Sequence, residues 1–247
     1  KNIDSSEGYG IKKEGINFES NILLRNVREE VLRLSNLHRN SLNKLNVTIF
    51  EGLGRFKTQN ELEIICPKTQ KTINKISSKK ILISVGGKPK KMNIPGEELA
   101  WTSDDIFELD RFPDSILIVG GGYIACEFAS IFRNLGTKVT QLIRGQRLLN
   151  GFDEDLSSCI EESSAFNGIN IISRNQLKSI KRVNGNLEST LVSGDKILTN
   201  NILFATGREP NLLPLNLDFL NLKMDGQYLD VDELNQTSNA NIFAVGD

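Results

Sequence analysis

The sequence lacks the features that mark secreted, membrane-spanning or nucleic-acid-binding proteins. Its three cysteines, Cys66, Cys126 and Cys159, are widely spaced and odd in number, so they form neither a disulfide framework nor a zinc pattern. This usage favours a reducing compartment. No apolar run approaches the ~18 residues that cross a bilayer. The 30 basic and 31 acidic side chains nearly cancel, which leaves no field of one sign to favour nucleic acid or an anionic membrane as a partner.

Both ends of the chain are interpreted as truncations of a longer protein. The chain begins at Lys1 and ends at Asp247, directly after an apolar strand expected over 242–245. A chain that ends directly after a buried strand lacks the segment that would continue from that strand. The 247 residues are enough for two domains with cores of their own.

The spacing of apolar residues predicts an α/β protein. A long amphipathic helix is expected over 18–45, followed by a short strand over 47–50. The run at 80–85 predicts a strand buried on both faces. Further strands are expected at 55–56, 62–66, 72–76, 116–119, 139–143, 169–172, 179–183, 187–192, 196–198 and 202–205. Further helices are expected over 122–135 and from the N-cap Asp153 to 167.

Two ten-residue segments share one pattern. Residues 80–89 and 201–210 each contain an apolar strand, a small residue, a glycine and a proline, and each follows a polar meander. The second segment closes a domain that opens with a glycine-rich loop. By analogy the first closes a similar domain, whose loop would lie before Lys1. We therefore expect two Rossmann-like dinucleotide-binding domains of the three-layer ββα type, the first incomplete.

Gly120, Gly122 and Ala125 fit the dinucleotide fingerprint G-x-G-x-x-G/A. A buried strand precedes them, a helix follows, and a second strand lies at the right distance. Gly120 permits the tight turn, Gly122 lets backbone approach a pyrophosphate, and Ala125 lets the helix pack closely. The start of the helix supplies free N–H groups for the phosphates. The alternative is a tight turn in an unrelated α/β domain.

The second strand ends at Ile143 and is followed by Arg144. NAD-specific sites place a carboxylate at the end of this strand, where it bonds the ribose 2′-hydroxyl. Arginine instead offers a planar, permanently charged fork of donors to a 2′-phosphate, and Arg147 could reinforce it. The pattern favours NADPH. The alternative is that both arginines are solvated loop charges.

In these motifs the chain resembles the FAD-dependent pyridine nucleotide-disulfide oxidoreductases, and among them glutathione reductases of the plant and cyanobacterial kind. The resemblance covers essentially the whole chain. It rests on the order and spacing of residues 51–56, 81–87, 93–96, 102–104, 120–129, 142–144, 151–154, 204–211 and 242–247.

The resemblance implies a domain order and an activity. Residues 1–96 would be the C-terminal part of an FAD-binding domain, 97–208 the NADPH-binding domain, and 209–247 a return segment toward the FAD or central domain. Hydride would pass from NADPH to FAD, and electrons would then pass to a redox disulfide and on to a small-molecule disulfide. Glutathione disulfide is the expected substrate. No nucleic acid or membrane partner is implied, and the full-length protein would be a homodimer in the cytoplasm or an organelle stroma.

The resemblance also implies site residues. Tyr123 would lie over the flavin until nicotinamide displaces it, Glu127 would lie near the nicotinamide, and Asp247 would bond the ribityl chain of FAD. Tyr123 packed at a helix start and Glu127 on a solvated face are the alternatives. The NADPH set is Gly120, Gly122, Tyr123, Ile124, Ala125, Glu127, Arg144, Arg147, Gly207 and Arg208. The FAD set is Gly54, Ser84, Gly86, Gly87 and Asp247, and no metal ligands are implied.

The chain departs from the family pattern at three places. Asn150 stands where a second arginine is usual, although Arg147 could compensate, and His38 stands where the helix near the glutathione site often carries tyrosine. The Cys-x4-Cys pair and the histidine base do not occur, so no catalytic residue is expected here and the fragment alone should be inactive. Within the family, mercuric reductase and dihydrolipoamide dehydrogenase are alternatives, the latter expecting an acid at Ile143. A flavoprotein or nucleotide-binding module without disulfide chemistry is another.

Overall fold

A computed structural model describes residues 18–247 of the chain. Lys1 and the remainder of the first 17 residues of the expected 1–96 domain lie outside the described residues. Contacts divide the chain into two compact units. Unit 1 contains the described residues up to Arg33 together with Pro89–Gly207, and unit 2 contains Leu34–Lys88 and Arg208–Asp247.

Unit 1 is built on a five-stranded parallel sheet with the strand order β6-β13-β7-β8-β9. From β7 the chain continues to β8 and then to β9, which lie in this order on one side of β7. It then returns to the other side of β7 as β13. Such a reversal is the switch point of a doubly wound sheet. The strands are β6 (Trp101–Thr102), β7 (Ser115–Val119), β8 (Lys138–Leu142), β9 (Asn170–Ile172) and β13 (Asn201–Phe204).

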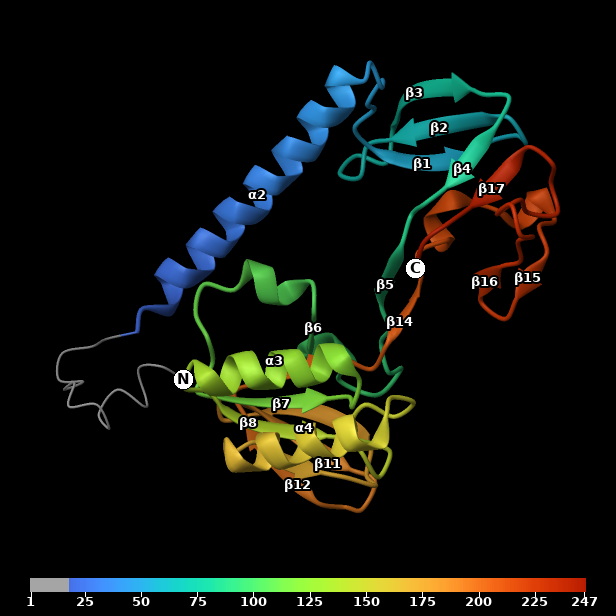
Figure 1. Cartoon of the computed structure of the whole chain (residues 1–247). Helices are drawn as coiled ribbons and strands as arrows, with labels where there is room; N and C mark the ends of the chain where they lie inside the picture. Colours follow the sequence, from blue (N-terminus) through green and yellow to red (C-terminus); the bar gives the residue numbers. More distant parts are fainter. Residues whose placement is uncertain (1–17) are drawn as a thin grey trace. The chain divides into compact units, whose positions relative to one another are not determined.

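One face of the parallel sheet is covered by α3 (Tyr123–Asn134) and α4 (Glu154–Phe166). Figure 1 shows α3 running alongside β7. Ala125, Ala129 and Phe132 recur at helical spacing and pack against Ile116 and Ile118, which are alternate residues of β7. The small alanines let the helix lie close to the strand.

The other face is covered by an antiparallel sheet of β10 (Leu177–Val183), β11 (Asn186–Leu191) and β12 (Lys196–Thr199). Leu117 and Val119 of β7 point to this side and pack with Leu177, Leu187 and Leu191. Unit 1 therefore has three layers, helices, parallel sheet and antiparallel sheet, which confirms the predicted Rossmann-like ββα arrangement.

Unit 2 has a separate core formed by Phe56, Ile81, Ile83, Leu215, Leu220 and Ile242. A parallel pair, β4 (Ile81–Ile83) with β17 (Ile242–Ala244), joins two distant parts of the chain. A meander of β1 (Leu53–Phe56), β2 (Glu61–Ile65) and β3 (Thr72–Ser77) is present as predicted. The remaining strands are β5 (Gly87–Pro89), β14 (Arg208–Pro210), β15 (Met224–Asp225) and β16 (Tyr228–Leu229).

The long helix predicted near the start is α2 (Ser20–Lys44). Leu24 is its buried residue, and Arg28 Nη1 donates to the carbonyl of Leu109 at 2.8 Å. Phe18, just before the helix, stacks on Phe112 with ring centroids 6.4 Å apart. Short 3-10 turns occur at η2 (Glu97–Leu99), η3 (Asp105–Glu108), η4 (Leu213–Leu215) and η5 (Asp218–Leu220). No helix within residues 18–247 combines the length and the apolar composition that a bilayer span requires.

Two predicted strands differ from the structure. The strand over 47–50 is wrong: these residues have no regular structure, and Val47 and Phe50 are exposed. A short apolar run forms a strand only where a neighbour pairs with it, which periodicity alone does not reveal. The run at 80–85 forms the shorter strand β4, and it is buried on one face rather than two, since Leu82 is 57% exposed.

Asp153 caps α4 as predicted, because its side chain accepts hydrogen bonds from the N–H groups of Asp155 at 3.0 Å and Leu156 at 3.3 Å. We expect Asp153→Ala to lower the free energy of unfolding by about 1 kcal/mol, measured by urea denaturation. Asp153→Ser, which keeps an acceptor oxygen, is the control and should lose much less. Equal stability of the Ala variant and the parent would contradict the cap.

Candidate functional site

The backbone turns tightly at Gly120, between β7 and α3. Gly120 has φ of 141°, and its N–H donates to the carbonyl of Leu142 at 2.9 Å. A Cβ on this residue would lie 2.1 Å from the carbonyl oxygen of Ala205, which follows β13. Backbone therefore occupies the place of any side chain, and this position requires glycine.

The start of α3 lacks a side-chain cap. Gly122 is the N-cap residue with extended backbone. Apart from Gly122 and its two chain neighbours, no atom lies within 4 Å of the place that its Cβ would take. The first N–H groups of a helix have no intrahelical partner, and they carry the positive end of the helix dipole. Open space in front of such a helix start suits a phosphate.

The third small residue of the motif brings the helix onto the sheet. Ala125 is fully buried, and its Cβ lies 3.5 Å from the place that a Cβ on Gly120 would take. Ile124 beside it is half-buried. A larger side chain at Ala125 would push the start of α3 away from the glycine loop (residues 120–122).

The segment that follows β8, the arginine loop (residues 144–149), is anchored to the glycine loop. Leu148 and Leu149 are buried against Ile143. The N–H of Leu149 donates to the carbonyl of Gly121 at 2.7 Å, and the N–H of Leu148 donates to Glu161 Oε1 at 2.7 Å. The two loops thus form one structure at the carboxyl edge of the sheet.

Arg144 and Arg147 are exposed on this anchored loop. Arg147 Nη1 lies 3.5 Å from the hydroxyl of Ser158, and Asn150, also exposed, adds no charge. Within the described part of the chain, no carboxylate forms an ion pair with either guanidinium. Both guanidinium groups are therefore free to bind an anion, on a loop whose backbone contacts the glycine loop.

Tyr123 and Glu127 lie one turn apart on α3. Tyr123 is 55% exposed, and Glu127 is exposed. Residues four apart share a face of a helix, so the ring and the carboxylate are neighbours on the surface. Neither is part of the core. His38 on α2 is exposed as well.

A hollow of about 250 Å³ opens in unit 2 at the carboxyl ends of β4 and β17. Ligands of open α/β sheets bind beyond the carboxyl ends of parallel strands. Its lining includes Gly86 and Asp247 from the expected FAD set, together with Val85, Tyr228 and Val245. Ser84, directly after β4, is exposed and lies in the sequence between two lining residues, Ile83 and Val85. Gly54, in β1, is not part of the lining.

Arg208 links several of these residues. Its Nε donates to Asp247 Oδ2 at 2.6 Å, and its guanidinium also donates to the carbonyl of Gly87. A Cβ on Gly87 would lie 2.7 Å from Asp247 Oδ2, so glycine allows the carboxylate to approach the backbone. The structure thus brings Arg208, expected for NADPH, together with two residues expected for FAD inside unit 2. Gly207 belongs to unit 1 and is exposed.

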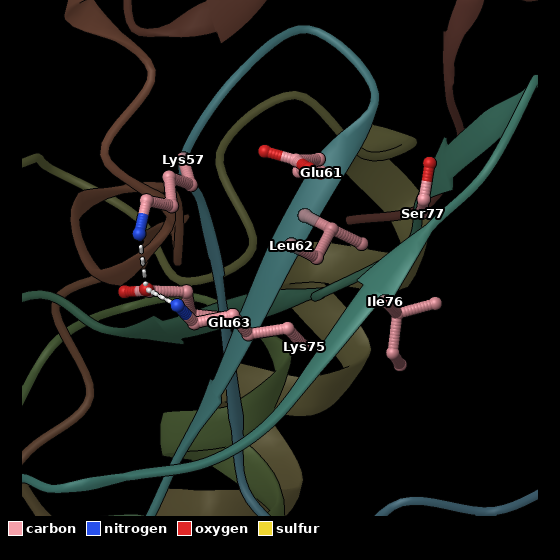
Figure 2. Close-up of a pocket in the computed structure, with 7 residues that line it drawn as sticks. All are labelled: Lys57, Glu61, Leu62, Glu63, Lys75, Ile76 and Ser77. Carbon is pink, nitrogen blue, oxygen red and sulfur yellow. Dashed lines mark hydrogen bonds and ion pairs between the residues drawn. The ribbon is translucent and has the colours of Figure 1, made fainter.

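A smaller hollow, of about 160 Å³, lies on the meander β1–β3. Figure 2 shows Lys57 and Lys75 directed at Glu63, with distances of 3.0 Å and 3.9 Å from their Nζ atoms to Oε1. The hydrogen bond to Glu63 raises the pKa of Lys57. These charges satisfy one another, and the cluster is best described as an ion-pair group on a sheet surface.

Two further residues hold the site together, and sequence reasoning missed both. Glu161 on α4 anchors the arginine loop, because its carboxylate accepts the hydrogen bond from the N–H of Leu148. No pattern in the sequence connects these two residues. Gln141 in β8 is fully buried and donates to the carbonyl of Gly120 at 3.0 Å. A polar residue inside a predicted buried strand was the available signal for Gln141.

Known proteins resemble this chain over nearly its whole length. Residues 5–247 match the family described as pyridine nucleotide-disulphide oxidoreductase. Glutathione reductase of Nostoc sp. is 37% identical over 99% of this chain and 55% of that protein. The chloroplastic/mitochondrial glutathione reductase of Pisum sativum is 36% identical over 99% of this chain and 44% of that protein. The chain spans about half the length of the curated relatives it matches.

A solved structure shares this fold. It is the Cu(II) complex of a mutant of the HOCl-induced flavoprotein disulfide reductase RclA from Escherichia coli. The TM-score is 0.80 at 25% identity, over 91% of this chain and 52% of that chain.

The two glycines of the loop should differ in their tolerance of a side chain. We expect Gly120→Ala to lower the free energy of unfolding by about 3 kcal/mol or more, because its Cβ collides with backbone. Gly122 has φ of −80° and open space at the place of a Cβ. Gly122→Ala should therefore lower the free energy of unfolding by less than about 1 kcal/mol. Urea denaturation of both variants tests this, and equal losses would contradict the loop geometry.

The cysteines should differ in reactivity. Burial raises the pKa of the Cys126 thiol, whereas a hydrogen bond with Thr69 lowers the pKa of the Cys66 thiol. Because the thiolate is the nucleophile, iodoacetamide should label Cys66 at lower pH than Cys126, as read from peptide masses. Labelling in concentrated urea, where the environments are lost, should make the two rates similar. Faster labelling of Cys126 in the folded protein would contradict the assignment.

Proposed function

Because this chain belongs to the pyridine nucleotide-disulphide oxidoreductase family, we propose that it forms the nucleotide-binding portion of an NADPH-dependent flavoprotein disulfide reductase. The observation that carries this proposal is the uncapped start of α3 at Gly122 beside the exposed Arg144. The first offers donors to a pyrophosphate, and the second offers a charged fork to a further phosphate.

NADPH would bind to unit 1, in the proposed domain 97–208. Its pyrophosphate would rest on the glycine loop and on the N–H groups that open α3. Its 2′-phosphate would be bound by Arg144. Arg147, on the same loop, would take the role of the second arginine that the family usually has at the position of Asn150. Tyr123, Ile124 and Glu127 would face the nicotinamide half of the cofactor, and so would Gly207.

FAD would bind to unit 2. The supporting observation is the hollow at the carboxyl ends of β4 and β17, with the Asp247 carboxylate on its lining. Asp247 would accept hydrogen bonds from the ribityl hydroxyls, while Ser84, Gly86, Gly87 and Gly54 would approach through backbone. The proposed domain segments 1–96 and 209–247 both contribute to this unit. When bound, FAD supplies hydride acceptance and electron transfer.

Arg208 holds the protein's own groups in place. Its guanidinium is bound to Asp247 and to the carbonyl of Gly87. A role in binding NADPH would require this guanidinium to exchange the carboxylate for a phosphate. The two anions differ little in the geometry that a planar fork of donors requires.

The substrate that we propose is a small-molecule disulfide, with glutathione disulfide favoured by the names of the relatives. Cys66, Cys126 and Cys159 are free and lie far apart in the sequence, so we assign none of them to disulfide exchange. A homodimeric protein in the cytoplasm or an organelle stroma is part of this proposal. Dihydrolipoamide dehydrogenases are expected to have an acidic residue at the position of Ile143. Ile143 is apolar and buried, which disfavours dihydrolipoamide dehydrogenase as the alternative.

We expect Arg144→Glu in the intact protein to raise the Kd for NADPH by about tenfold to a hundredfold, since a charged hydrogen bond is replaced by repulsion. The Kd for NADH, which has no 2′-phosphate, should change by less than about threefold. Fluorescence titration measures both constants.

Arg182→Glu is the matched control, because Arg182 is an exposed arginine of the same unit on β10. It should leave both constants unchanged. An unchanged preference between NADPH and NADH in Arg144→Glu would overturn the assignment of the 2′-phosphate site. Failure of the unaltered protein to bind either nucleotide would overturn the proposed function itself.

A further inference from the structure

We propose that Gln141 is a positioning residue for the nucleotide phosphates, because its side-chain amide fixes the orientation of the glycine loop. The proposal rests on the proposed function, in which the loop binds a dinucleotide. It adds a residue on the second strand of the sheet to the sites that the fingerprint itself defines.

Gln141 occupies a place where packing alone would favour an apolar residue. It is fully buried, and its neighbours across the sheet are Ile118 of β7 and Ile171 of β9. Val139, two residues earlier on the same face of β8, is part of the apolar core beneath α3. A primary amide in such surroundings costs stability unless its polar atoms are paired. One of them is not: Gln141 Oε1 has no hydrogen-bond partner within residues 18–247.

The paired half of the amide reaches the glycine loop. Gln141 Nε2 donates to the carbonyl of Gly120 at 3.0 Å and lies 3.8 Å from the sulfur of Cys126 on α3. The N–H of Gly120 donates to the carbonyl of Leu142, also in β8. Two consecutive residues of β8 thus hold both polar groups of Gly120, one through its side chain and the other through its backbone.

This arrangement fixes a donor in the loop. The C=O and N–H of a trans peptide point in opposite directions. Holding the Gly120 carbonyl toward Gln141 therefore turns the N–H of Gly121 away from the interior. Within the described chain this N–H has no backbone acceptor. Without Gln141 the peptide could rotate, and the donor would no longer be held ready for a phosphate.

A positioning role and a purely structural role make opposite predictions. If Gln141 served only stability, its removal would lower Tm and leave nucleotide affinity unchanged. If it orients the loop, an apolar replacement removes the unpaired Oε1 but also leaves the Gly120 carbonyl without its donor, so the two effects on Tm oppose each other while affinity falls. Because the effect acts on the pyrophosphate, it should be equal for NADPH and NADH.

The test is Gln141→Met, which keeps the shape of the side chain and removes its donor, in the intact protein. We expect the Kd for NADPH and for NADH to rise by about tenfold each, or about 1.4 kcal/mol. The Tm measured in the absence of nucleotide should change little. Amide hydrogen exchange at residues 120–122 should become faster. Gln141→Leu also removes the donor but has a differently shaped side chain. It replaces the Met variant if that variant folds poorly, and we expect the same results from it.

Ser189→Ala is the matched control. Ser189 lies in β11, is fully buried, and has a hydroxyl without a hydrogen-bond partner within residues 18–247. Its replacement also removes a buried unpaired polar atom, yet it should leave both Kd values unchanged. Normal affinity in Gln141→Met, or a loss for NADPH alone, would overturn this inference while the proposed function stands. An unaltered protein that binds neither nucleotide would overturn both.

Discussion

The contact between the backbone at Gly120 and the carbonyl of Ala205 constrains the rest of the site. A Cβ at Gly120 would lie 2.1 Å from that oxygen, so β7 can turn into α3 only where the side chain is absent. The turn directs the start of α3 past the carboxyl edge of the sheet. Ala125 then allows the helix to approach the sheet closely. The first N–H groups of α3, which like those of any helix have no intrahelical partner, thus lie beside the glycine loop.

The same edge carries the arginine loop, and the two loops depend on each other. The N–H of Leu149 donates to the carbonyl of Gly121, and the buried side chain of Leu148 anchors the loop to the core. The fixed backbone leaves Arg144 exposed at a defined place. Binding of the phosphates common to all dinucleotides and selection of the 2′-phosphate can therefore be separate tasks of adjoining loops, as the proposed function requires.

The strand pairings give a physical meaning to the similarity between residues 80–89 and 201–210. Each segment contains a strand with a parallel neighbour, β4 or β13, then a glycine, and it ends in a short strand, β5 or β14. These two short strands pair with each other. The N–H of Asn211 donates to the carbonyl of Gly86, which extends this pairing. The repeated pattern thus corresponds to two equivalent exits from parallel strands.

The sequence by itself determined the Rossmann-like unit, because glycine spacing, apolar periodicity and caps such as Asp153 are local signals. It also marked Gly120, Gly122, Ala125 and Arg144. Only the tertiary structure decided which strands found neighbours: residues 47–50 did not, and β4 was buried on one face. Only the fold brought Glu161 to the arginine loop, Arg208 to Asp247 and Gln141 to the carbonyl of Gly120. Such contacts join residues far apart in the chain, and no local pattern encodes a partner that folding alone brings within hydrogen-bond distance.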